Sequence, residues 1–239
     1  MHWHVVEGRT GCAFAKDHGY TAVIVDALRA SCTAAMLFEA GAEDITLVPD
    51  VESARALKAT DPETLLFGER DGLPPSGFDY GNSPRDVSAA HGKSIAFTTS
   101  NGTALMLEAW GAPEVLMASV TNATALVQYV LQWESDVVLI PAGNVDDPEF
   151  SAQEDWVAAA AIVMLTDREV GEGTATLREW RHMISLDGVA KLFATAPHAE
   201  RLRSIGLEED IAFCARSNVT NALPKAAAKT DNGIVLRCV

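Results

Sequence analysis

Residues 20–39 read YTAVIVDALRASCTAAMLFE and contain two patterns in succession. Residues 20–25 form a continuous apolar run rich in β-branched residues, which is typical of a parallel strand that is buried on both faces. The run ends at Asp26. An apolar stripe at helical spacing follows over residues 29–39, and Gly41 stands where a helix is expected to stop. A strand, a polar turn and a helix in this order are the unit of an α/β fold.

The same order repeats along most of the chain. Further strands are predicted at residues 45–48, 65–67, 94–98, 114–118, 136–140 and 233–238. Helices are predicted at residues 51–58, from 103 to 110, from 122 to about 133, at 153–165, and in short pieces at 178–181, 189–193 and 197–205, with a brief strand or helix end at 210–215. This alternation predicts a three-layer α/β/α fold with a largely parallel or mixed sheet. Residues 1–239 are expected to form a single α/β domain, either as one unit or as two similar α/β lobes that share one cleft.

Composition narrows the class of ligand. The chain has 239 residues, of which 48% are hydrophobic, and its 18 basic and 33 acidic residues give a net charge of −15. Such a charge opposes binding to nucleic acid and to anionic membranes, so a small ligand is expected. The longest apolar run, residues 156–165, is far shorter than a membrane span, and residues 1–9 do not resemble a secretory leader. The four cysteines show no Cys-x-x-Cys pair, which predicts free thiols and a cytoplasmic protein.

One stretch, residues 67–86 (FGERDGLPPSGFDYGNSPRD), is too rich in glycine and proline to form a helix or a buried strand. Long loops in compact domains are usually functional. The loop is expected to be anchored by its apolar residues, Phe67, Leu73, Phe78 and Tyr80. Glu69 and Arg70 follow the predicted strand 65–67 directly, where they are placed to meet a ligand. The alternative is an ordinary ion pair in a surface loop.

Polar clusters follow four of the predicted strands, at residues 26–33, 68–86, 98–103 and 119–122. In a parallel sheet all four would open onto one edge, where such sheets bind ligands. A fifth cluster, residues 151–155, begins the long amphipathic helix. Backbone amides at helix amino ends bind oxyanions, and carboxylates beside arginines suit a divalent metal ion with a phosphorylated anion.

Each candidate residue also has a purely structural interpretation. Asp26 could cap the following helix, and Ser151 with Glu154 matches a capping box, whereas Asp155 has no such duty. Asn101 and Gly102 could form only a turn, and Thr103 or Asn122 could be a plain helix cap. Arg29 could be a solvated side chain on its helix. Their joint occurrence favours a site.

The common phosphatase signatures do not fit. The sequence Asp26-Ala27-Leu28 lacks the second aspartate of haloacid dehalogenase-type phosphatases, no cysteine precedes an arginine by six residues, and no Walker-type loop occurs. Arg181-His182 lacks the glycine that follows in histidine phosphatases, and the six histidines show no metal-ligand spacing. The residues alone therefore indicate an α/β enzyme that acts on a small anion, with a divalent metal as one option.

Taken together, the segments resemble the 2-phosphosulfolactate phosphatase family from about residue 22 to residue 225. In chain order they are VDALRAS (25–31), GERDGLPPSGFDYGNSPRD (68–86), TTSNGT (98–103), ASVTN (118–122), PAGN with QEDWVAAA (141–144 and 153–160), and GLEEDIAFC with NALPK (206–214 and 221–225). The long loop is the most specific of these. Ser100 stands where a threonine is expected, and residues 146–149 are an acidic insertion.

The resemblance implies a Mg²⁺-dependent cytoplasmic phosphatase that hydrolyses (2R)-2-phospho-3-sulfolactate to 3-sulfolactate and phosphate in coenzyme M biosynthesis. Two alternatives stay open, a phosphatase for other 2-hydroxy-acid phosphates and a noncatalytic anion-binding protein on the same scaffold. The number of tryptophans is compatible with a homodimer.

Roles for individual residues follow from the resemblance as hypotheses. Asp26, Glu154 and Asp155 would hold Mg²⁺ directly or through water. Arg29 and Arg70 would neutralise the anionic substrate, and Glu69 would orient the attacking water. The substrate pocket is expected to be lined by Asn82, Asn101, Gly102, Thr103 and Asn122.

Overall fold

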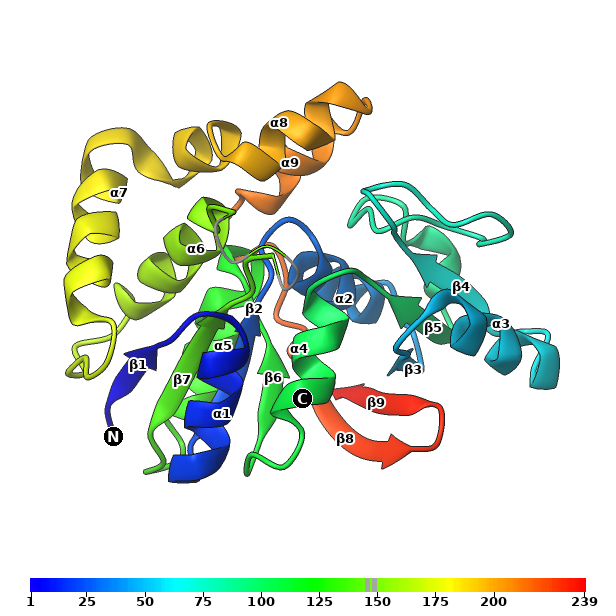
Figure 1. Ribbon diagram of the computed structural model, residues 1–239, viewed down its shortest axis with the longest axis horizontal. Coiled ribbons are helices and arrows are strands. Elements are labelled where there is room, and N and C mark those ends of the chain that lie inside the picture. Colours follow the sequence, from blue (N-terminus) through cyan, green and yellow to red (C-terminus); the bar gives the residue numbers. More distant parts are fainter. Residues whose placement is uncertain (145–146, 148–149) are drawn as a thin grey trace.

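The computed structural model describes residues 1–144, 147 and 150–239, and in these ranges nine strands form one mixed sheet (Figure 1). The strands are β1 (Trp3–Val5), β2 (Thr21–Val25), β3 (Asp44–Leu47), β4 (Leu65–Gly68), β5 (Ser94–Thr98), β6 (Val115–Met117), β7 (Val137–Pro141), β8 (Pro224–Thr230) and β9 (Gly233–Cys238). Their order across the sheet is β1-β7-β2-β6-β8-β9-β3-β5-β4.

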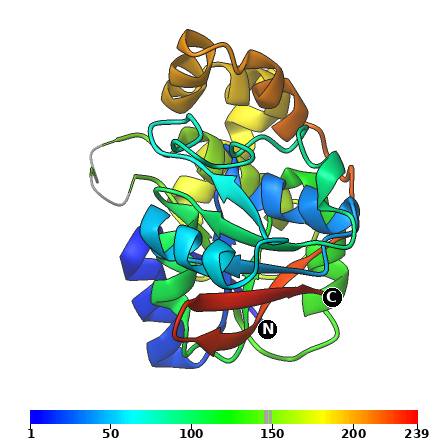
Figure 2. The same cartoon turned by 90° about the vertical axis from the view of Figure 1, so that its right-hand side faces the viewer.

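Helices cover both faces of this sheet (Figures 1 and 2). They are α1 (Gly8–His18), α2 (Ala30–Glu39), α3 (Val51–Thr60), α4 (Gly102–Ala109), α5 (Ala123–Val130), α6 (Gln153–Val163), α7 (Thr174–Ala194), α8 (Pro197–Ser204) and α9 (Glu208–Cys214). Short 3₁₀ turns lie at Ser88–Ala90 and Val120–Asn122.

Successive residues of β2 show why the layers form. Val23 and Val25 belong to the hydrophobic core beneath α5 and α6, whereas Ala22 and Ile24 belong to the core beneath α1 and α4. Because side chains alternate between the faces of a strand, a fully apolar strand must be covered on both sides. The predicted three-layer α/β/α fold is therefore confirmed.

The sheet consists of two parallel groups joined by an antiparallel hairpin. Strands β1, β7, β2 and β6 are parallel to one another, as are β3, β5 and β4. The hairpin β8–β9 pairs antiparallel with β6 on one side and with β3 on the other. Strand direction reverses three times between β6 and β3, so the two groups run in opposite senses. The sheet is therefore mixed, which is one of the two predicted forms, and the polar clusters do not all follow strands of one parallel group.

One helix and two strands were not predicted from the sequence, namely α1, β1 and β8. The sequence of α1 contains two glycines, and β8 (PKAAAKT) is largely exposed, so neither shows a clear apolar pattern. The short helices predicted at 178–181 and 189–193 are parts of α7, which is interrupted at Gly188. Residues 208–214 form the helix α9.

Residues 69–87, which follow β4, contain no helix or strand in the described structure, as predicted. Tyr80 anchors the loop by stacking on Phe67 with ring centroids 4.6 Å apart. Phe78 packs against a small core cluster at β4 and β5. Leu73 is 49% exposed, so its prediction as an anchor is wrong.

The cysteines are free thiols, as predicted from their spacing in the sequence. All four cysteines are free, and three of them are buried. Within the described ranges, no helix combines the length and the apolarity needed to cross a bilayer.

The hairpin should be important for stability because it connects the two strand groups. Leu236 of β9 is fully buried opposite Ile45, and Leu236→Ala is expected to lower the free energy of unfolding by about 2–5 kcal/mol. Val235, on the other face of the same strand, is partly exposed, so Val235→Ala should cost less. Urea unfolding of both variants measures the difference, and equal losses would contradict this account.

Candidate active site

The carboxyl ends of the two strand groups meet at Asp26 and Gly102. Asp26 follows β2, and Gly102 is the first residue of α4 after β5. A Cβ atom at Gly102 would lie 2.8 Å from Asp26 Oδ2 and 2.9 Å from Ala30 Cβ, closer than such contacts allow. Glycine at position 102 therefore permits the start of α4 to approach the carboxylate. The predicted clusters at 26–33 and 98–103 therefore converge, although the strands that precede them run in opposite directions.

Asp155 is a buried carboxylate held by backbone amides. Its Oδ1 accepts a hydrogen bond from Ala27 N at 2.7 Å, and its Oδ2 accepts one from Gly143 N at 3.0 Å. These bonds connect the start of α6 to the residues that follow β2 and β7. Burial raises the pKa of Asp155 well above its ordinary value, and the charges of Glu154 and Asp26 add to the effect.

Asp26 lies next to this group and is also buried. Its Oδ1 accepts a hydrogen bond from Ala30 N at 3.1 Å, so it also contributes to the start of α2, as its structural interpretation required. Burial raises the pKa of Asp26 to about 6, even though the Ala30 amide and the charge of His198 favour the ionised form.

Glu154 does not form the capping box that its spacing from Ser151 suggested. The N-cap of α6 is Ala152, with no side-chain cap, and Glu154 Oε1 instead lies 3.2 Å from Nδ1 of His198 on α8. Burial alone would lower the pKa of His198, but the hydrogen bond to Glu154 and the charges of the nearby acids raise it overall. Glu154 Oε2 is buried and has no hydrogen-bond partner among the described residues.

Glu69 links the two loops that follow β4 and β5. Its Oε1 accepts a hydrogen bond from Ser100 N at 2.8 Å, and its Oε2 accepts one from Gly72 N at 2.8 Å. The ordinary ion pair with Arg70, which was the alternative interpretation of this loop, does not form, since Arg70 donates instead to Glu69 O at 2.6 Å and to Thr98 Oγ1 at 2.9 Å. Glu69 is therefore fixed by backbone amides, with lone pairs left over for a ligand or water.

Two adjoining cavities are lined by some of these groups, namely Asp26, Glu69 and His198, whereas Glu154 and Asp155 line neither. The outer one has a volume of about 230 Å³ and is lined by Glu69, Asp71, Gly72, Ser100, Asn101, Gly143, Asn144, Phe150, His198 and Arg201. The inner one, of about 20 Å³, is lined by Asp26, Leu28, Arg29, Glu69, Gly72, Asn82, Asn101 and His198. Asn82 is 4% exposed, and its Oδ1 has no hydrogen-bond partner among the described residues. Buried polar atoms without partners are uncommon, so Asn82 Oδ1 indicates that the inner cavity receives a polar ligand.

Arg29 lines the inner cavity, but its charge is already neutralised. Its Nη1 lies 2.6 Å from Oδ2 of Asp210 on α9, and its Nη2 donates to Gly72 O at 2.9 Å. The other oxygen of Asp210 accepts a hydrogen bond from Ser83 Oγ at 2.9 Å. With Arg29 3% exposed and Asp210 1% exposed, the alternative that Arg29 is a solvated helix residue is wrong.

Six of the predicted site residues do not line the two cavities, namely Arg70, Gly102, Thr103, Asn122, Glu154 and Asp155. Arg70 makes the contacts given above, and Thr103 exchanges hydrogen bonds with Thr99 at 3.0 and 3.1 Å, which closes the turn before α4. Asn122 Oδ1 accepts from Ser119 N at 2.9 Å, and its Nδ2 donates to Ala222 O at 3.0 Å. Thr103 and Asn122 thus have structural roles, which were the alternatives to their predicted roles in substrate binding.

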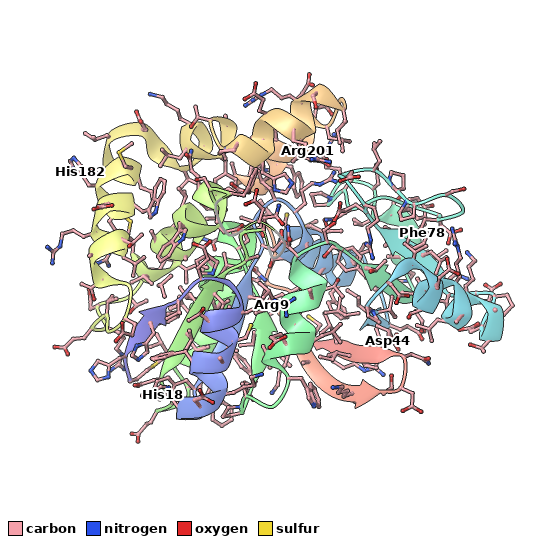
Figure 3. All side chains as sticks on the ribbon, viewed as in Figure 1. Arg9, His18, Asp44, Phe78, His182 and Arg201 are labelled. Atoms are coloured by element: carbon pink, nitrogen blue, oxygen red, sulfur yellow. The ribbon has the colours of Figure 1, made fainter. Side chains whose placement is uncertain are left out.

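Two basic residues at the site were not selected from the sequence. His198 and Arg201 lie on α8, which crosses the top of the molecule in Figure 3, where Arg201 is labelled. Their spacing of three residues places them on one side of a helix, but only the packing of α8 brings that side to the cavity.

The predicted metal ligands require a separate test. Among the described residues, no group of three or more His, Cys, Asp or Glu side chains is arranged to hold a metal ion by itself. Mg²⁺ commonly uses one or two carboxylates, several waters and a substrate phosphate. The buried acids Asp26 and Glu154, with the unpartnered Glu154 Oε2, fit such a shared site. Asp155 already accepts two amide bonds.

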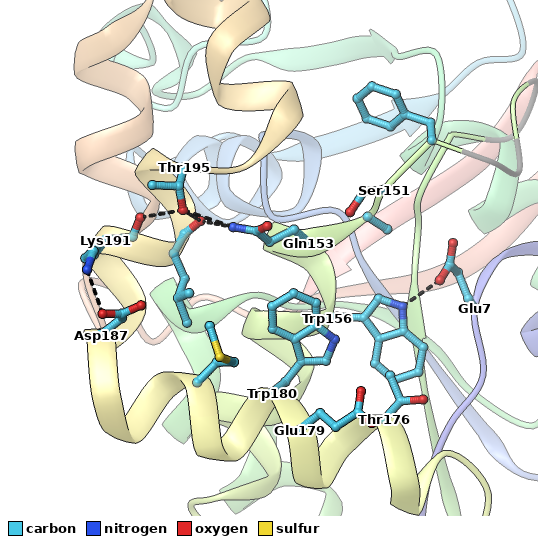
Figure 4. A pocket seen from close by; sticks show the side chains of 14 residues that line it. Glu7, Ser151, Gln153, Trp156, Thr176, Glu179, Trp180, Asp187, Lys191 and Thr195 are labelled. Atoms are coloured by element: carbon cyan, nitrogen blue, oxygen red, sulfur yellow. Dashed lines mark hydrogen bonds and ion pairs between the residues drawn. The ribbon is translucent and has the colours of Figure 1, made fainter.

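A larger cavity lies elsewhere, between α6 and α7 (Figure 4), with a volume of about 690 Å³. Trp156 and Trp180 project into it, and Trp156 Nε1 donates to Glu7 Oε2 at 2.5 Å. Lys191 in its wall is paired with Asp187 at 2.7 Å. The walls of this cavity are acidic and aromatic, and its lysine is already paired, so the cavity does not suit a phosphorylated anion. The volume of a cavity therefore does not identify the anion site in this protein.

Comparisons with known proteins identify the family of this chain. The profile of the family described as 2-phosphosulpholactate phosphatase matches residues 11–229. A probable 2-phosphosulfolactate phosphatase of Carboxydothermus hydrogenoformans is 32% identical over 203 residues, which cover 85% of this chain and 84% of the relative. Proteins with the same name from Thermotoga petrophila and Deinococcus radiodurans are each 33% identical, over 85% and 88% of this chain and 88% and 89% of their own.

The fold and the site thus define an α/β enzyme, and the chain belongs to the 2-phosphosulfolactate phosphatase family. This family name places it among the phosphoric monoester hydrolases, and the resemblance found in the sequence is confirmed. Of the acidic insertion at 146–149, only Asp147 lies within the described residues.

The Arg29–Asp210 pair should act mainly on stability. Arg29→Ala leaves the Asp210 carboxylate buried without its main counter-charge, so the free energy of unfolding should fall by about 3–5 kcal/mol. The matched control is Arg85→Ala, because Arg85 is 44% exposed and lies 3.8 Å from the same carboxylate. Its loss should be below about 1 kcal/mol by urea unfolding. A stable Arg29→Ala protein would show that the pair does not hold the site together.

The raised pKa of Asp26 predicts a pH dependence of stability in protein kept free of divalent ions. Its folded pKa of about 6 lies above the ordinary value of 3.8. The stability that Asp26 contributes is thus fully present below about pH 4 and is lost as the pH rises through 6. The free energy of unfolding of the wild type, relative to Asp26→Asn, should fall over this range. A difference that is flat with pH would contradict the raised pKa.

Proposed function

We propose that this protein hydrolyses the phosphate ester of 2-phospho-3-sulfolactate to give 3-sulfolactate and phosphate. The family membership and the names of the relatives support the reaction. The observation that carries the proposal is the meeting of buried acids with unpartnered polar atoms, Glu154 Oε2 and Asn82 Oδ1, where the two strand groups converge. By the same resemblance, we place the reaction in coenzyme M biosynthesis in the cytoplasm.

The acids of the site suit attack by water on phosphorus. In this reaction the bond from the attacking oxygen to phosphorus forms, the bond from phosphorus to the ester oxygen breaks, and a proton reaches the departing alkoxide. Glu69 lines both cavities and is fixed by two amides, so it is placed to orient the water. Asn82 would meet the substrate from the inner cavity.

Mg²⁺ is part of this proposal. Asp26 and Glu154 would hold the ion, with Asp155 contributing directly or through water, and the ion would supply the positive charge that a phosphate needs beside carboxylates. The chain's own contribution is to hold these acids in place, which it does through the amides of Ala27, Ala30 and Gly143.

The reaction is tested by measuring phosphate release from a panel of esters, namely 2-phospho-3-sulfolactate, phospholactate, phosphoglycolate and phenyl phosphate. We expect the highest kcat/KM for 2-phospho-3-sulfolactate, and we expect the activity to be lost with chelator and restored by Mg²⁺. Equal or faster turnover of phospholactate would assign the enzyme to other 2-hydroxy-acid phosphates. No phosphate release from any ester would indicate a noncatalytic anion-binding protein.

Asp26→Asn is the matched variant for this assay. It keeps the acceptor for Ala30 N but removes the charge, so the rate should fall by about 100-fold or more while circular dichroism shows an intact fold. Near-normal turnover would remove Asp26 from the mechanism.

A further inference from the structure

Helix α8 presents two basic side chains to the outer cavity. His198 and Arg201 are three residues apart and both line it, whereas Ala199 and Leu202 are buried in the core on the adjoining side of the helix. The apolar side therefore fixes the orientation of α8, and the adjoining side lines the outer cavity.

Arg201 has a partner that it can release. Its Nη2 lies 2.8 Å from Oδ1 of Asp71, and the two side chains are 52% and 88% exposed. Ion pairs this exposed are weak because water competes for both charges. An anion that reaches the cavity can replace the Asp71 carboxylate at little cost.

The backbone around Asp71 is fixed although its side chain is exposed. Gly72, the next residue, donates to Glu69 Oε2 at 2.8 Å and accepts from Arg29 Nη2 at 2.9 Å. Asp71 has a φ of 57°, which aspartate tolerates better than most residues. The carboxylate of Asp71 thus occupies a defined position at the cavity rim, where it pairs with Arg201 as an anionic group of a ligand would.

The other basic side chains at the site are engaged more deeply. Among the described residues that line the two cavities, the basic side chains are Arg29, His198 and Arg201. Arg29 is buried against Asp210, and His198 faces Glu154. Arg201 is therefore the cation best placed for an anionic group outside the acid cluster.

We propose that Arg201 is a specificity-determining residue, which exchanges Asp71 for a second anionic group of the substrate, a sulfonate or a carboxylate. Guanidinium binds both groups through paired hydrogen bonds. The proposal rests on the proposed function, because it assigns the second anion of the same phosphorylated substrate. It explains how an acidic protein distinguishes a multiply charged ester from a simple one.

Steady-state kinetics of Arg201→Ala test this role. With 2-phospho-3-sulfolactate, KM should rise by about 10- to 100-fold with kcat little changed, because the contact forms equally in substrate and transition state. Phenyl phosphate, which has no second anion, should be unaffected. If phospholactate shows the same rise, the carboxylate is the bound group; if it shows none, the sulfonate is. A rise that is equal for phenyl phosphate, or no rise with any ester, overturns the proposal.

Two further variants sharpen the result. Asp71→Asn removes the internal competitor and should lower KM for 2-phospho-3-sulfolactate by a few fold, whereas a raised KM would overturn the exchange. Arg203→Ala is the matched control, because Arg203 is an exposed arginine of the same helix that does not line either cavity and should leave KM unchanged.

Calorimetry separates this proposal from the proposed function because it needs no turnover. The wild type should bind 3-sulfolactate, and Arg201→Ala should bind it about tenfold or more weakly, with binding of inorganic phosphate unchanged. Equal binding of 3-sulfolactate by both proteins overturns the role of Arg201 even in an active phosphatase. An inactive wild type that shows the expected binding difference would instead reject the phosphatase activity alone.

Discussion

The buried ion pair between Arg29 and Asp210 is the contact on which the site depends. Arg29 directly precedes α2 and Asp210 lies on α9, at 3% and 1% exposure, and each also holds a part of the long loop, through Gly72 O and Ser83 Oγ. Because neither charge can be left unpaired away from water, the residues after β2, the loop after β4 and α9 are fixed as a unit. Glu69 and Asp26 take their relative positions from this unit.

The site contains buried carboxylates, and the proposed ligand is also negatively charged, so the two repel each other. Asp26 and Asp155 are buried together, and burial raises the pKa of both. A phosphate can enter such a cluster only with compensating positive charge, from a cation such as Mg²⁺ and from the side chains of α8. The net charge of −15 opposes anions in general, so recognition must be local and selective.

The antiparallel hairpin changes where a ligand can bind. In a wholly parallel sheet the loops at the carboxyl ends form a row along one edge, but here the hairpin reverses one strand group relative to the other. The residues after β2 and after β5 nevertheless meet, since Asp26 and Asn101 line the same cavity. Gly102 has no side chain, which lets the start of α4 reach Asp26.

The sequence by itself determined the α/β class, most strand positions and the family, since continuous apolar runs and helical stripes depend only on local spacing. It also identified Asp26, Glu69, Asn82, Asn101 and Arg29, which all line the inner cavity. Only the tertiary structure decided that Arg29 is neutralised by a residue 181 positions away, that Thr103 and Asn122 hold turns, and that α8 supplies His198 and Arg201. Partners distant in sequence leave no local pattern, because packing, and not spacing, brings them together.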